Sequence, residues 1–110
     1  MNTEEAVKIV MEELGWWPQP SAQKWYQRKG KEDSMEWKAP EQAFAHCKDL
    51  NVLAGIWSKE TCYVTFCFEQ GKVTVDGAEA GVSRIKKIRT IQDAALIATA
   101  EALQTIKVKR

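Results

Sequence analysis

The chain is poor in the residues that most often carry catalysis and metal binding. It has one histidine, His46, and three cysteines among its 110 residues. A cysteine–histidine nucleophile would have to use His46, and the adjacent Cys47 cannot serve because neighbouring side chains on a helix diverge. A contact of His46 with Cys62 or Cys67 across the fold is the alternative. The spacing of these residues fits no structural zinc site. The sequence therefore predicts a non-enzymatic protein with no catalytic residues, metal or cofactor.

Long apolar runs and a strong charge bias are also missing. No stretch approaches the roughly 18 apolar residues that cross a membrane, and the N-terminus lacks the basic start and apolar run of a signal peptide. A cytoplasmic protein without a membrane partner is expected, with its odd number of cysteines as free thiols. The net charge of +1 argues against nucleic-acid binding through bulk charge. The length suits a single domain, residues 1–110.

The clearest structural signal is a β-hairpin over residues 61–76. Two runs rich in β-branched and aromatic residues flank a turn that contains Gly71. On the first strand the alternation places four apolar side chains on one face, which we expect to lie in the core under the last helix: Cys62, Val64, Phe66 and Phe68. The opposite face carries Tyr63, Thr65 and Cys67.

The segments before this hairpin alternate between helical and extended patterns. An amphipathic helix is expected from its apolar spacing over residues 4–14, with Thr3 as N-cap and Gly15 at its end. Pro40 suits the first position of a second helix, which Asn51 would end. The remaining segments read as strands: residues 24–28, 35–38 and 52–58.

The segments after the hairpin lead into a helix. Residues 77–81 read as a loop, and residues 82–89 fit a strand or a helical lead-in. The alanine-rich stretch from Ile91 to about Thr105 predicts a helix that lies close on the sheet, because alanine lets the backbones approach. The pattern predicts an α+β fold. An antiparallel sheet of three to five strands is packed by the N- and C-terminal helices, with a short middle helix.

Tryptophan is the residue in surplus, with five in the chain and four of them before residue 40. Most should lie in the core, because each ring buries a large apolar area. The adjacent pair Trp16 and Trp17 sits in an extended segment where neighbours point opposite ways, so at least one should be exposed. Exposed tryptophan and tyrosine are typical of binding hot spots. We therefore predict a partner-binding surface formed by Trp16, Trp17, Tyr63 and Thr65.

Nucleic-acid binding is the alternative. A dense basic run comprises Arg84, Lys86, Lys87 and Arg89. Such a run can contact phosphates, with an affinity that falls steeply as salt rises. A solvated face that balances acidic residues elsewhere explains the same run.

The order of elements resembles the phage alpha-beta-alpha sandwich family, small phage-encoded proteins of unknown function. The matching residues are the turn at 14–17, the helix start at 40–44 and residues 93–98 of the last helix, whereas the basic run departs from the family. The resemblance implies a phage or mobile-element origin and no site residues. The sequence thus predicts a small accessory protein that binds a protein partner or associates with itself.

Overall fold

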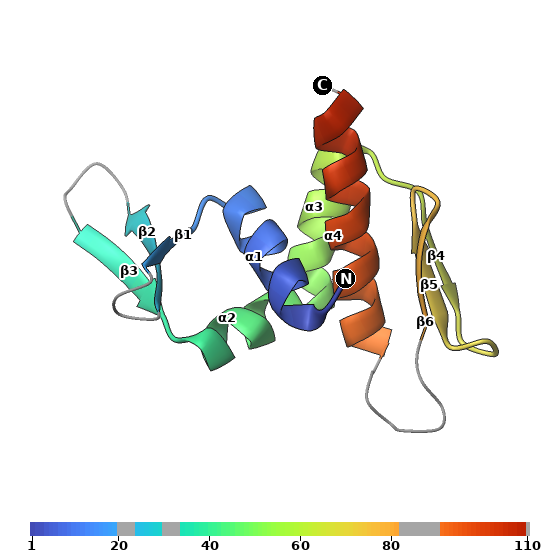
Figure 1. Ribbon diagram of the computed structural model, residues 1–110, viewed down its shortest axis with the longest axis horizontal. Coiled ribbons are helices and arrows are strands. Elements are labelled where there is room, and N and C mark those ends of the chain that lie inside the picture. The colour runs from blue at the N-terminus through green and yellow to red at the C-terminus, as the bar shows by residue number, and fades with distance from the viewer. Residues whose placement is uncertain (20–23, 30–33, 82–90, 110) are drawn as a thin grey trace.

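The computed structural model describes residues 1–19, 24–29, 34–81 and 91–109, and their elements run in the order helix, three strands, two helices, three strands, helix (Figure 1). The α+β class with antiparallel strands is confirmed. The helices are α1 (Thr3–Glu13), α2 (Pro40–Cys47), α3 (Leu50–Glu60) and α4 (Ile91–Lys109). The strands are β1 (Trp17–Gln19), β2 (Lys24–Lys29), β3 (Ser34–Lys38), β4 (Val64–Cys67), β5 (Lys72–Val75) and β6 (Ala78–Gly81).

The strands form two separate sheets at opposite ends of the molecule. Sheet A has the order β1-β2-β3 and sheet B the order β4-β5-β6, each antiparallel throughout. In Figure 1 the helices lie between sheet A on the left and sheet B on the right. The long axis of the molecule measures 47 Å.

Helix α4 is the centre of the core. It packs against β5 and β6 on one side and against α1 and α3 on another. Seven consecutive residues, 94–100, are buried, and four of them are alanine. A helical segment that is apolar on every side must be packed against other elements on every side. The small side chains of this segment let sheet B and α1 approach it closely. The predicted placement of this helix on the sheet is therefore confirmed for β5 and β6.

Local signals account for the helix ends. The Asn2 side chain, rather than Thr3, caps α1 by accepting a hydrogen bond from the Glu5 N–H at 2.8 Å. Gly15 follows α1 with φ +88°, a left-handed conformation that favours glycine. The Asp49 side chain caps α3 by accepting a hydrogen bond from the Asn51 N–H at 2.8 Å.

Three predictions about residues 52–81 are wrong. Residues 52–58 belong to α3 instead of a strand, because Leu53 and Ile56 are buried on one helical face. Phe68 is 73% exposed instead of buried under α4, since β4 is an edge strand and α4 packs on β5 and β6. Residues 78–81, expected in a loop, form β6. The ambiguous residues 82–89 lie outside the described residues.

Candidate functional site

The outward face of sheet A carries a row of three aromatic rings. Trp17 of β1, Tyr26 of β2 and Trp37 of β3 are directly opposite one another in the strand register. Directly opposed residues share a sheet face, so their rings meet. The ring centroids are 5.5 Å apart for Trp17 and Tyr26 and 5.3 Å apart for Tyr26 and Trp37. We call these three residues the aromatic ladder.

The ladder is open to solvent although its rings contact each other. Trp17 is 49% exposed and Trp37 is 45% exposed, with Tyr26 half-buried between them. Offset or tilted aromatic pairs hold each other in place, so the ladder is ordered before any partner arrives. An exposed and preorganised strip of tryptophan and tyrosine is the composition found at binding hot spots.

The opposite face of sheet A attaches it to the helices. Trp25, next to Tyr26 in the chain, packs against the core, and the Gln27 side chain donates a hydrogen bond to the Leu14 carbonyl at 3.0 Å. These contacts come from β2 residues whose side chains alternate with the ladder residue Tyr26. The sheet therefore has one face committed to the fold and one face carrying the ladder.

Trp16 has the role opposite to that of Trp17. It is 4% exposed, its ring meets the His46 ring edge-on with centroids 6.4 Å apart, and the Lys38 Nζ lies 5.3 Å from its ring centroid. The Trp16 N–H donates to the Met11 carbonyl at 2.9 Å, which holds it beside α1. Trp16 is thus a core residue, and an extended backbone turns Trp17 outward.

The other two predicted partner-binding residues lie at the sheet B end of the molecule, Thr65 in β4 and Tyr63 immediately before it. Tyr63 is 86% exposed and Thr65 is also exposed. The Tyr63 N–H donates to the Asp76 Oδ1 at 2.7 Å, and its carbonyl accepts from the Asp76 N–H at 2.8 Å. The predicted set is therefore divided between the two ends of the molecule. Trp17 is joined instead by Tyr26 and Trp37, neither of which belongs to the predicted partner-binding set.

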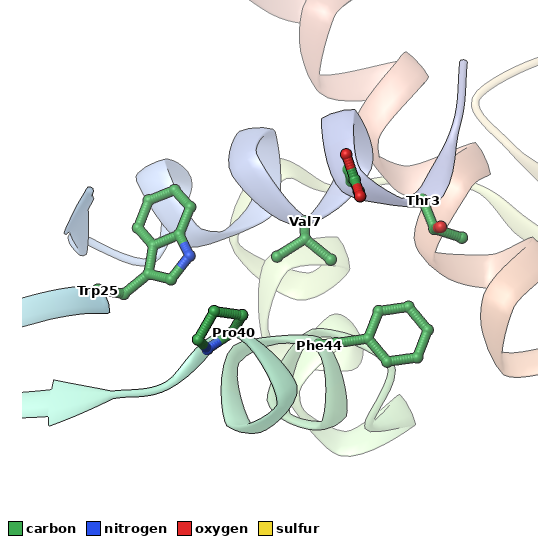
Figure 2. Close-up of a pocket in the computed structure, with 6 residues that line it drawn as sticks. Thr3, Val7, Trp25, Pro40 and Phe44 are labelled. Carbon is green, nitrogen blue, oxygen red and sulfur yellow. The ribbon is translucent and has the colours of Figure 1, made fainter. Parts of the chain in front are cut away.

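A pocket of about 230 Å³ lies between α1, α2 and β2 (Figure 2). In the figure Trp25 and Phe44 stand at opposite ends of the pocket, with Val7 above Pro40 between them. Its lining is mainly apolar, and Thr3 and Glu4 complete it. Such a pocket suits a small apolar group, but it is on the helix side of sheet A, away from the ladder.

The residues considered for nucleophilic chemistry lie in two places. His46 on α2 contacts Trp16, whereas Cys67 is on β4, at the sheet B end of the molecule (Figure 1). Burial and then Lys38 lower the pKa of His46 below its ordinary 6.5, which favours neutral imidazole at pH 7. Across the described parts of the chain, no three His, Cys, Asp or Glu residues form a group that could hold a metal.

Two of the three thiols should be unreactive in the native protein. Burial raises the pKa of Cys47 to about 12, and burial together with Asp76 raises the pKa of Cys62 to about 11. Since the thiolate is the reactive form, at pH 8 Cys62 should react with iodoacetamide about a hundredfold more slowly than an ordinary thiol, and Cys47 more slowly still. Peptide mass spectrometry of native and urea-unfolded protein measures both rates. Native Cys47 alkylation at the unfolded rate would contradict this placement.

The basic run proposed for nucleic-acid contact, residues 84–89, lies outside the described residues and stays a prediction. None of the described helices is both long and apolar enough to cross a membrane. No family model matches the chain, and no curated protein or solved structure is significantly similar to it.

Proposed function

We propose that this chain is a non-enzymatic protein-binding module that docks a partner protein on the aromatic ladder. The observation that carries this proposal is the row of Trp17, Tyr26 and Trp37, two of them about half exposed and all three in ring contact. Burying these rings against a partner removes apolar area from water at a small entropic cost, because ring contacts already restrict them.

The net charge of the chain, +1, supports a protein partner over a nucleic acid held by bulk charge. Acidic residues outnumber basic ones among residues 1–60, whereas basic residues predominate in the remainder of the chain. Binding of single-stranded nucleic acid combines aromatic stacking with a positively charged groove. The strands of sheet A themselves contain four basic residues against one acidic residue, so capture of a nucleic acid at the ladder is the outcome that would compete with this proposal.

The cellular setting of the partner comes from the resemblance to phage alpha-beta-alpha sandwich proteins. A phage or mobile-element accessory protein would act by capturing a host or phage protein. The partner should therefore be sought in cells that carry the phage or mobile element.

Site-specific photocrosslinking tests the proposed function. Trp37 is replaced by p-benzoylphenylalanine, with Val108, an exposed apolar residue at the end of α4, as the matched control position. We expect one dominant crosslinked protein from position 37 and none of it from position 108. The partner should also disappear when Trp17→Ser is added to the position 37 probe. Identical products from both positions, or no product from position 37, would contradict the proposal.

A further inference from the structure

A second surface, at the other end of the molecule, is an exposed edge of sheet B. Strand β4 is at an edge of sheet B, and among the described residues only β5 pairs with it. Two exposed aromatic residues flank it, Tyr63 before the strand and Phe68 after it. Exposed strand edges are templates for pairing with another chain.

The free edge presents backbone groups from alternate residues. The hydrogen bond from Asp76 to the Tyr63 carbonyl shows that Tyr63 bonds toward β5. In an antiparallel pair, bonded and non-bonded residues alternate, so Thr65 and Cys67 bond in the same direction. The N–H and carbonyl groups of Val64 and Phe66 therefore point outward.

The side-chain layer above β4 is also incomplete. Val64 and Phe66 face the same side as Val73 and Val75, which are fully buried under α4. Val64 and Phe66 themselves are only partly buried. The described contacts of the Phe66 ring are with Trp57 of α3, at 6.0 Å between centroids, and with Phe68, at 6.2 Å.

Nothing in the sequence of β4 protects its edge. Natural edge strands commonly carry a charge, a proline or a bulge that discourages pairing. The stretch from residue 61 to residue 68 contains no charged residue and no proline, and each β4 residue has a single partner on β5. The absence of charge has a second consequence. The stretch can pair with a copy of itself without like-charge repulsion.

We propose that β4 pairs antiparallel with β4 of a second copy of this chain, about a two-fold axis at Phe66. Opposed residues must share a sheet face, and Phe66 opposite itself satisfies this condition while joining the outward backbone groups. Thr65 then lies opposite Cys67 of the second copy, and Val64 faces Phe68, the first residue of the turn after β4, whose carbonyl accepts a hydrogen bond from the Gly71 N–H. The two sheets become one six-stranded sheet, and Trp57 from each copy covers the join. This surface is separate from the aromatic ladder, so the two proposals fail independently.

Sedimentation velocity of the purified full chain tests whether the pairing occurs. Over roughly 1–300 µM we expect a concentration-dependent dimer. Phe68→Lys places an ammonium group in the apolar join and should weaken association about tenfold or more. Val108→Lys, at an equally exposed apolar residue on α4, should leave it unchanged. A protein that is monomeric throughout this range, or equal dimerisation of the Phe68→Lys variant, would overturn the proposal.

A cysteine pair tests the register. In Thr65→Cys the new thiol would lie opposite Cys67 of the second copy, at an exposed position that should tolerate the change. Mild oxidation should give a dimer with a 65–67 disulfide, identified by peptide mapping. Glu79→Cys, on β6 at the far edge of the same face, should give no 67–79 disulfide between copies. Absence of the 65–67 bond, or its formation at no higher yield than the 67–79 bond, would overturn the pairing.

Discussion

Replacing Trp16 by alanine should destabilise the protein by about 3–5 kcal/mol, the usual cost of removing a large buried aromatic side chain. The ring is buried between His46 and Lys38, and its backbone is tied to α1. Small domains are stable by about 5–15 kcal/mol, so this single change should remove a large part of that stability. Urea unfolding followed by circular dichroism measures the loss.

The adjacent residue provides the matched control. Trp17→Ala removes a ring of the same size from an exposed position, where it contacts Tyr26. The expected cost is about 1 kcal/mol, the value of one aromatic pair. Equal losses for Trp16→Ala and Trp17→Ala would contradict the assignment of one ring to the core and the other to the surface.

Leu53→Ala should cost about 2–5 kcal/mol of unfolding free energy, because it opens a cavity beside fully buried neighbours. Leu53 is on the face of α3 that packs toward the core, with Ile56 one turn further on. Its loss would also loosen the position of Trp57, whose indole N–H donates to the Thr99 hydroxyl at 2.8 Å. Urea unfolding measures this change too.

Gly55→Ala is the control for Leu53→Ala within the same helix. Gly55 is exposed, and an added Cβ would meet nothing within 4 Å. Alanine in an exposed helix interior is favoured over glycine by about 0.5–1 kcal/mol, so this variant should be more stable than the wild type. A loss of stability in Gly55→Ala would contradict the helical assignment of residues 50–60.

Much of the fold could be predicted because its local signals agree with its packing. The apolar spacing and Gly15 located α1, and the alternation around Trp25 located the hairpin of sheet A. The alanines of α4 correctly indicated close approach to a sheet. In each of these segments, intrinsic preference and tertiary contacts favour the same structure.

The failures occurred where tertiary packing or an overlooked turn decided the structure. Residues 52–58 contain valine, isoleucine and tryptophan, which favour strands, but burial of one face against the core makes them helical. The Asp76-Gly77 pair has positive φ at both residues and forms the tight turn between β5 and β6. Asp-Gly is a strong hairpin signal, and it would have indicated the third strand of sheet B.

The candidate surface could be predicted only in part. An exposed Trp17 was expected from the alternation at residues 16 and 17, but the neighbours of Trp17 depend on strand register. Pairing β1 with β2 and β2 with β3 brings Tyr26 and Trp37 beside it. Strand order within a sheet is a long-range property that local patterns do not contain.

Calorimetric titration of the partner captured at position 37 is the most direct test of the central claim that the aromatic ladder binds a protein. The wild type is compared with a Trp17→Ser/Trp37→Ser double variant, whose urea unfolding is measured in parallel. Two hot-spot tryptophans predict an affinity loss of about a hundredfold or more, while the unfolding free energy falls by only about 2 kcal/mol, the value of the two lost ring contacts. Equal affinity of the folded double variant and the wild type would contradict the claim.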